Sequence, residues 1–179
     1  IALKESSRLQ QATYAWAIGV GQKVAERVLA GKAVAWALRA QFTLARWLAL
    51  NNVRKMIGIH RSRLLVTGAA PISPDLIKWY LALGVPMLEV WGMTETCGAS
   101  TAMTAKHIKP GSIGPATSYN EVRLDPETQE ILVRGPNVFM GYLNLPDKTA
   151  EAIDADGWMH TGDLGTIDAE GYGNIVGRI

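Results

Sequence analysis

A hydroxyl and a carboxylate stand side by side in the segment Trp91-Gly92-Met93-Thr94-Glu95-Thr96. Thr94 can donate a hydrogen bond to a phosphate oxygen, and Glu95 offers the hard oxygen ligand that Mg²⁺ prefers. Trp91 adds a flat aromatic face, and stacking on such a face contributes about 0.5–1.5 kcal/mol. A Thr-Glu pair is also common at helix N-termini, where the hydroxyl caps the helix. The residues by themselves favour neither a phosphate site nor a cap.

A turn of small residues, Thr67-Gly68-Ala69-Ala70-Pro71, follows a short apolar run. Small side chains allow a flat ligand to approach the backbone closely, and the main-chain groups of the turn can meet the edge of an adenine. Taken alone, a glycine turn after a strand is usually only a turn.

A third candidate is the carboxylate of Asp163, which follows a glycine in the segment DGWMHTGDL, residues 156–164. A carboxylate can accept two hydrogen bonds at once and therefore suits the neighbouring hydroxyls of a ribose. The alternative is a turn aspartate that satisfies backbone amides. Arg178 is a cation that can reach a ribose or a phosphate, but the pair Gly177-Arg178 alone does not assign it a role.

Elements are needed to position these residues, and the first part of the chain, residues 1–57, is predicted to be helical. Its apolar residues recur at three- and four-residue spacing, which is typical of amphipathic helices. The two runs, separated at Gly31-Lys32, are Ala17, Val20, Val24, Val28 and Trp36, Ala40, Leu44, Trp47. Gly58 is predicted to end a final short turn over residues 53–57.

The middle of the chain predicts a strand, a helix and a second strand. RLLVTG at 63–68 and PMLEVWG at 86–92 are the strands. Ser73 and Pro74 mark the start of a helix that runs to about Leu83. Strands joined in this way are parallel, so both glycine-rich exits are expected at one edge of the sheet, where ligands bind in open α/β sheets.

Beyond Gly111 the pattern changes to short strands and turns, with one helical stretch, TAEAID, at 149–154. This predicts a smaller, mainly antiparallel unit. The predicted fold class is therefore α/β, with a layered sheet-and-helix subdomain followed by a small β-rich subdomain. The expected parts are a helical segment at 1–62, the strand-helix-strand part at 63–110 and the β-rich part at 111–179.

Composition places the chain in the ordinary globular class, since 48% of its 179 residues are hydrophobic and 19% are charged. The single cysteine, Cys97, cannot form an internal disulfide, which agrees with a cytoplasmic location. Charge is uneven: residues 1–63 hold 11 Lys/Arg and two acids, a net charge of +9, whereas residues 64–179 carry a net charge of −7. Such a basic region suits phosphate-rich partners, an anionic membrane or acidic protein neighbours.

Five motifs, in order, resemble those of the acyl-activating superfamily of adenylate-forming enzymes. WGMTE at 91–95 resembles its YGxTE signature, and TGAAP at 67–71 is similar to its SGGAP turn. EILVRGPNVFMGY at 130–142 and DGWMHTGDLG at 156–165 resemble two further segments. The closing GRI is similar to the start of the hinge to a C-terminal domain. Trp91 stands where tyrosine is usual, and Ala69 where glycine is common.

The resemblance implies a role for each candidate residue. Trp91 stacks on an adenine and Thr94 contacts the α-phosphate, with Glu95 helping to hold Mg²⁺. Asp163 binds the ribose hydroxyls, assisted by Arg178. The residues implied to bind the nucleotide are Ala69, Ala70, Pro71, Trp91, Gly92, Met93, Thr94, Asp163 and Arg178, and those implied to act in catalysis are Thr94 and Glu95.

The resemblance also implies a reaction in which ATP converts a carboxylic acid to an acyl-adenylate and CoA then displaces AMP. The helical stretch that ends in LARWLALNNVRKMIG resembles an insertion of long-chain fatty acyl-CoA synthetases, so a long-chain fatty acid is the expected substrate. A medium-chain, aryl or amino acid is the alternative, and a non-catalytic AMP-binding or membrane-binding module is another. Trp36 and Trp47 are expected in the core, with the lining of an acyl tunnel as the alternative.

The family's phosphate loop and distal lysine have no counterpart in this sequence, so the chain by itself is predicted to have little or no ligase activity. Small molecules are the expected partners: a fatty acid, ATP and CoA. Contact with the inner face of a membrane and a homodimer are further hypotheses. Nucleic acid is not expected, because the basic residues belong to amphipathic helices.

Overall fold

The computed structural model describes residues 7–179, and the part of the predicted helical segment at 1–6 lies outside them. The chain forms two compact units. Among the described residues, a helical unit comprises 7–65 and Ser73–Met87, and a β unit comprises Val66–Ile72 and Leu88–Ile179. Each unit is described by itself.

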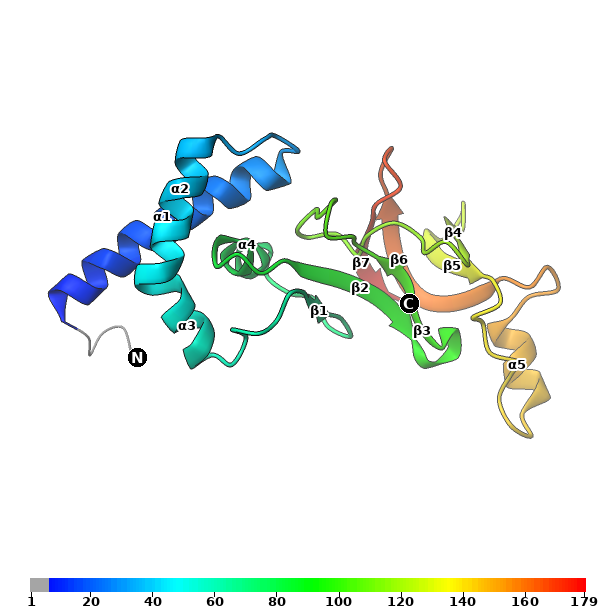
Figure 1. The fold of residues 1–179 in the computed structure, drawn as a ribbon. Helices are drawn as coiled ribbons and strands as arrows, with labels where there is room; N and C mark the ends of the chain where they lie inside the picture. The colour runs from blue at the N-terminus through cyan, green and yellow to red at the C-terminus, as the bar shows by residue number, and fades with distance from the viewer. Residues whose placement is uncertain (1–6) are drawn as a thin grey trace. The chain divides into compact units, whose positions relative to one another are not determined.

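The helical unit is built from helices that the sequence pattern predicted. Its elements are α1 (Arg8–Leu29), α2 (Trp36–Ala45), a π-helical turn (Arg46–Leu50), α3 (Asn51–Met56) and α4 (Pro74–Ala82). The break at Gly31-Lys32 is confirmed, and α3 ends just before Gly58, which has a φ of +80°. Helices α1 and α2 lie against each other (Figure 1). Ala17, Val20, Ala45, Leu50 and Leu83 form the core of the unit.

The expected core position of Trp36 and Trp47 is wrong. Trp36 is 83% exposed and Trp47 is 74% exposed. The other edge of α2 packs inward instead, through Leu38, Phe42 and Ala45 at four- and three-residue spacing. The stripe at 36, 40, 44 and 47 therefore lies outside the core of the unit.

Helix α4 begins where Ser73 and Pro74 predicted, although the Ser73 hydroxyl makes no capping bond. The backbone carbonyl of Ser73 instead accepts from the amides of Leu76 and Ile77. The helix packs closely on α1, since a Cβ at Gly21 would lie 2.1 Å from the carbonyl oxygen of Ala82. Only glycine allows the two helices to approach so closely.

The first sheet of the β unit has the order β1-β2-β3. These strands are β1 (Leu65–Thr67), β2 (Met87–Met93) and β3 (Gly98–Ala102). The Leu65 amide donates to the Pro86 carbonyl, and Gly68 lies against the Val90 carbonyl, so the order of partners along β1 and β2 is the parallel one that was predicted. Strand β3 pairs antiparallel with β2 and was not predicted.

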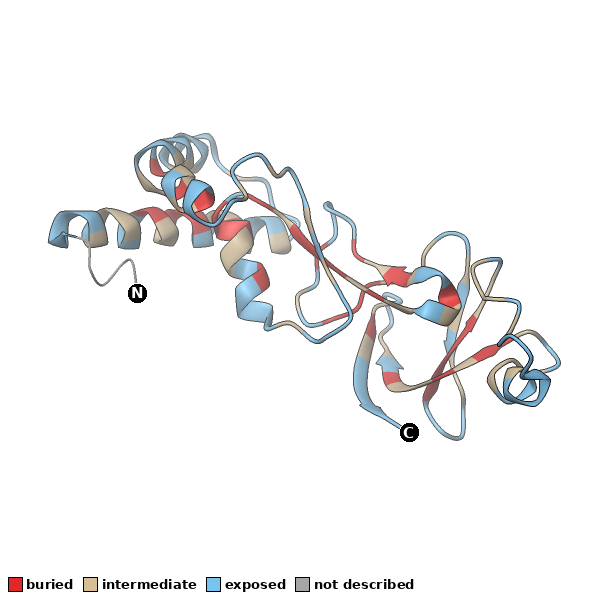
Figure 2. Cartoon of the chain, turned by 90° about the horizontal axis from the view of Figure 1, so that it is seen from below, coloured by how far each residue is buried: buried red, intermediate tan, exposed pale blue. Residues whose placement is uncertain are grey.

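The second sheet has the order β4-β5-β6-β7, with every neighbouring pair antiparallel. Its strands are β4 (Glu121–Leu124), β5 (Glu130–Arg134), β6 (Met159–Ile167) and β7 (Gly173–Arg178), with α5 (Pro146–Ala152) between β5 and β6. The sheet is curled, and β6 bends strongly along its length (Figure 1). Four of the five residues of β5 are buried, and so are Met159 and Thr161 at the start of β6. Figure 2 colours buried residues red. The mixed α/β fold class and the antiparallel second part are confirmed.

In the part of the chain that the structure describes, no helix is both long enough and apolar enough to cross a membrane.

Candidate functional site

The end of β2 is shaped by Gly92, which sits at an irregularity in the pairing with β3. Trp91 pairs with Thr101, but Gly92 pairs with Ala99, so β3 has an extra residue there. A Cβ on Gly92 would lie 1.8 Å from the carbonyl oxygen of Gly98. Any other residue would push the two strands apart, and the path of the chain after Trp91 would change.

The chain then makes a short 3-10 turn, Thr94–Thr96, which carries the predicted phosphate and metal residues. Thr96 holds this turn, because its buried hydroxyl accepts from the Met93 amide at 3.0 Å and lies 3.1 Å from the Met93 carbonyl. Thr94 is exposed, and its hydroxyl makes no hydrogen bond to any residue that the structure describes. Thr96 therefore acts as the local cap of the turn. The Thr94 hydroxyl has no protein partner among the described residues, so it is free to donate to an oxygen of a ligand.

Glu95 is fastened to the loop that follows β5. Its carboxylate accepts a hydrogen bond from the Tyr142 hydroxyl at 2.9 Å, and its backbone carbonyl accepts from the Phe139 amide at 2.7 Å. The hydrogen bond to the Glu95 carboxylate raises the pKa of the Tyr142 phenol. Sequence reasoning gave Tyr142 no role, although the Gly-Tyr end of the 130–142 segment was the available signal.

Trp91 and Asp163 meet, although 72 residues separate them. The indole Nε1 of Trp91 donates to Oδ2 of Asp163 at 2.9 Å. The indole is only 8% exposed and packs with Ile113, Ile131 and Val133. Little of the ring is therefore open to a stacking ligand. The N–H edge of the indole points toward Asp163.

Arg178 also lies beside Asp163. The two residues pair directly across β6 and β7, and Nε of Arg178 is 3.6 Å from Oδ1 of Asp163. The Arg178 side chain is 71% exposed and that of Asp163 is 19% exposed, so the contact is screened by solvent and the guanidinium remains available to a second anion. Indole, carboxylate and guanidinium thus form one cluster.

The turn after β1 places Ala69, Ala70 and Pro71 on the surface. Ala69 has a φ of +67°, in the left-handed region that glycine adopts most readily. Ala69 stands where glycine is common in the enzymes that the segment resembles, and its positive φ explains why glycine suits this position. Gly68 is also required, because a Cβ there would lie 2.8 Å from the carbonyl oxygen of Val90.

A magnesium ion fits the candidate site only with help from a ligand. Within residues 7–179 no group of three or more His, Cys, Asp or Glu side chains gathers as a metal cage. Glu95 has one carboxylate oxygen bonded to Tyr142, and the other has no hydrogen-bond partner among the described residues. A single carboxylate completed by phosphate oxygens and water is a common way to hold Mg²⁺, so Glu95 suits that role.

Comparison with known proteins identifies the family. The model of the family described as AMP-binding enzyme matches residues 23–143, which is more than half of the chain. The chain belongs to this family. The matched range contains the 67–71 turn, the 91–96 segment and Tyr142, whereas Asp163 and Arg178 lie beyond it.

Two proteins to which the chain is similar are named as CoA ligases. It is 37% identical over 175 residues to the putative fatty-acid–CoA ligase fadD11 of Mycobacterium tuberculosis, covering 98% of the chain and 30% of that protein. It is 38% identical over 179 residues to the long-chain-fatty-acid–CoA ligase ACSBG2 of Gallus gallus, covering 98% and 23%. Among solved structures, ATP-bound MatB from Rhodopseudomonas palustris matches with a TM-score of 0.58 and 40% identity, over 65% of this chain and 25% of that one. The chain spans less than a third of each.

Proposed function

We propose that this chain supplies adenosine-binding residues to an ATP-dependent ligase that joins a long-chain fatty acid to CoA. The observation that carries the proposal is the hydrogen bond between the Trp91 indole and the Asp163 carboxylate, with Arg178 alongside. Each carboxylate oxygen has two lone pairs, so Asp163 can keep these partners and still accept from two ribose hydroxyls. Thr94 and Glu95 belong to the turn that follows β2, the strand that carries Trp91. There the exposed Thr94 hydroxyl suits the α-phosphate, and Glu95 suits its Mg²⁺.

The proposed reaction needs no protein nucleophile. An oxygen of the fatty acid carboxylate attacks the α-phosphorus of ATP, the bond to the bridging oxygen breaks, and pyrophosphate leaves with its electron pair. The CoA thiolate then attacks the acyl carbonyl and AMP leaves. The protein contributes by orienting the nucleotide and by matching the charge that develops at phosphorus. Magnesium, when bound, would neutralise phosphate charge beside Glu95.

The fatty acid is proposed from the names of fadD11 and ACSBG2, and its long chain from the name of ACSBG2 and from the helical segment before β1. An enzyme for a medium-chain, aryl or amino acid is the alternative, because the structure of an anthranilate CoA ligase, AuaEII, also matches, with a TM-score of 0.59 and 26% identity. Release of pyrophosphate with hexadecanoate, octanoate or benzoate, measured in the longer protein, separates these substrates.

Isothermal titration with AMP tests the adenosine site directly. We expect Asp163→Ala to weaken AMP binding by about tenfold or more, since two hydrogen bonds to a charged acceptor are lost. Asp147→Ala is the matched control, because Asp147 is an exposed carboxylate of the same unit with no hydrogen bond to a described residue. Equal affinity of the intact chain and Asp163→Ala, or no AMP binding by the intact chain, overturns the proposal.

We propose a second role for the helical unit, which is contact with an anionic lipid surface. The supporting observation is the exposed apolar stripe of Trp36, Leu44 and Trp47, in a region whose net charge is strongly positive. Amphipathic surfaces of this kind bind at membrane interfaces through aromatic and basic side chains. An enzyme whose substrate dissolves in a bilayer would benefit from being held there.

A further inference from the structure

Glu130 is a buried carboxylate near Asp163, the candidate ribose residue. It is the first residue of β5 and is only 6% exposed. Removing a carboxylate from water is costly unless hydrogen bonds replace the lost hydration. The hydrogen bonds of Glu130 therefore have to offset the free-energy cost of burying its carboxylate.

Both oxygens of Glu130 are bonded to the strand that carries Asp163. Oε1 accepts from the backbone amide of Gly162 at 2.7 Å, and Oε2 lies 2.8 Å from Nδ1 of His160. Hydrogen bonds to an ionised acceptor are about twice as strong as those between neutral groups. The carboxylate thus holds one side chain and the Thr161–Gly162 peptide, which lies one residue before Asp163.

Hydrogen bonds restrain the backbone on both sides of Gly162. Gly162 has a φ of +73°, and its carbonyl accepts from the Ile179 amide at 2.9 Å. On the other side, the Thr161 hydroxyl donates to the Ile131 carbonyl at 2.7 Å and accepts from the Asp163 amide at 3.2 Å. These bonds fix the backbone on both sides of the Gly162 peptide, and Glu130 supplies the only charged acceptor among them.

We propose that Glu130 is a positioning residue for the ribose site. By holding the Gly162 amide and the His160 ring, it sets the direction in which the Asp163 carboxylate points, both toward the Trp91 indole and toward the two ribose hydroxyls. Glu130 itself does not touch the nucleotide. The inference rests on the proposed function, because it assigns a role within the same site.

The test is a double-mutant cycle read by AMP titration. Glu130→Gln keeps the shape of the side chain but removes its charge, so the hydrogen bond that it accepts from the Gly162 amide is weakened. We expect Glu130→Gln to weaken AMP binding by about three- to tenfold. In the Asp163→Ala background the same change is expected to have no further effect, because Glu130 acts only through Asp163.

The ligand supplies a second readout that a merely structural role would not move. AMP and 2′,3′-dideoxy-AMP differ only in the hydroxyls that Asp163 is proposed to bind, so Glu130→Gln should weaken AMP but leave dideoxy-AMP unchanged. Glu121→Gln is the matched control, since Glu121 is a carboxylate of the same sheet that binds Arg134 at 3.0 Å. That control should leave both affinities unchanged.

Three results overturn the inference while the ribose site stands: no effect of Glu130→Gln, an equal effect in both backgrounds, or an equal effect on the two nucleotides. If Asp163→Ala itself leaves AMP affinity unchanged, the proposed function fails first. Should Glu130→Gln not fold, His160→Leu removes only the half-exposed partner of Glu130. It should give a smaller loss that is again confined to AMP, and a loss shared with dideoxy-AMP contradicts the proposal.

Discussion

At the scale of single residues, the contact between Trp91 and Asp163 changes what the tryptophan is expected to do. The indole is buried in an apolar cluster and directs its N–H at a carboxylate. A tyrosine, usual at this position in the enzymes that the segment resembles, also combines a ring with a polar edge. The residue therefore supplies a hydrogen bond to Asp163, whereas stacking of an adenine on its ring stays a prediction.

Trp91→Phe separates these two contributions. The smaller ring keeps an aromatic face but has no donor for Asp163, so we expect AMP binding to weaken by about three- to tenfold. The smaller side chain also leaves space in the core and should destabilise the unit by about 1–3 kcal/mol. Titration with AMP and thermal melting measure the two effects. Unchanged AMP affinity would mean that the ring alone matters.

Residue types and motifs predicted Trp91, Glu95 and Asp163 as candidates, but not their contacts. The partners Trp91 and Asp163 are 72 residues apart, and Glu95 and Tyr142 are 47 residues apart. Neither helical nor strand periodicity relates such pairs. Thr96 was overlooked because its hydroxyl bonds to its own turn, and only the path of the backbone reveals that.

At the scale of elements, strands with branched apolar residues were predicted well and β3 was missed. The segments 130–135 and 158–167 alternate or concentrate apolar residues, and they form β5 and β6. Strand β3 has the sequence GASTA, whose small residues give little strand preference. It forms because β2 offers an edge to pair with, which is a tertiary effect that the local sequence does not contain.

A loop before β4 is tied to the hairpin between β6 and β7, and this connection should depend on pH. Lys109 donates to the carboxylates of Asp168 and Glu170, which lowers the pKa of Asp168 and raises that of Lys109. The depressed Asp168 pKa means stabilisation that is present above the unfolded value of about 3.9 and is lost as the pH falls through the folded value. The raised Lys109 pKa means stabilisation present below about 10.4 and lost at higher pH.

Lys109→Met should therefore lower the melting temperature between about pH 5 and pH 9, by roughly 1–3 °C because the pair is exposed. As the pH falls from about 5 toward 2, the difference between the variant and the intact chain should shrink, because Asp168 becomes protonated and its attraction to Lys109 is lost. Lys106→Met is the control, since Lys106 is an exposed lysine of the same loop. A difference that does not shrink as the pH falls would show that packing of the lysine stem, and not its charge, joins the two segments.

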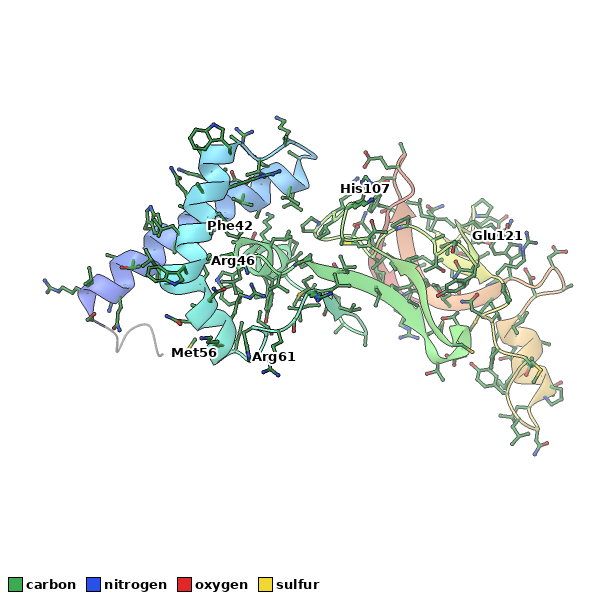
Figure 3. All side chains as sticks on the ribbon, in the orientation of Figure 1. Phe42, Arg46, Met56, Arg61, His107 and Glu121 are labelled. Carbon is green, nitrogen blue, oxygen red and sulfur yellow. The ribbon has the colours of Figure 1, made fainter. Side chains whose placement is uncertain are left out.

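At the scale of the whole molecule, the helical part of the chain is basic and the remainder is acidic. The helical part at 1–63 carries a net charge of +9, and the remainder, which includes the β unit, carries −7. The nucleotide candidates all lie in the β unit. The helical unit instead exposes aromatic and apolar side chains, and Met56 and Arg61 project from its surface near the end of α3 (Figure 3).

Liposome flotation tests whether this unit binds lipid. Vesicles of phosphatidylcholine with phosphatidylserine should carry the chain to the top of a gradient, whereas phosphatidylcholine alone should not, since the basic residues need an anionic surface. At 1 M salt the Debye length falls to about 3 Å, so the preference should largely disappear.

Replacing Trp36 and Trp47 by serine should reduce the bound fraction severalfold, because these exposed side chains would enter the interface. Leu143→Ser, an exposed apolar residue of the β unit, should change nothing. Equal flotation with both lipid mixtures would instead leave the stripe as a surface for another protein segment.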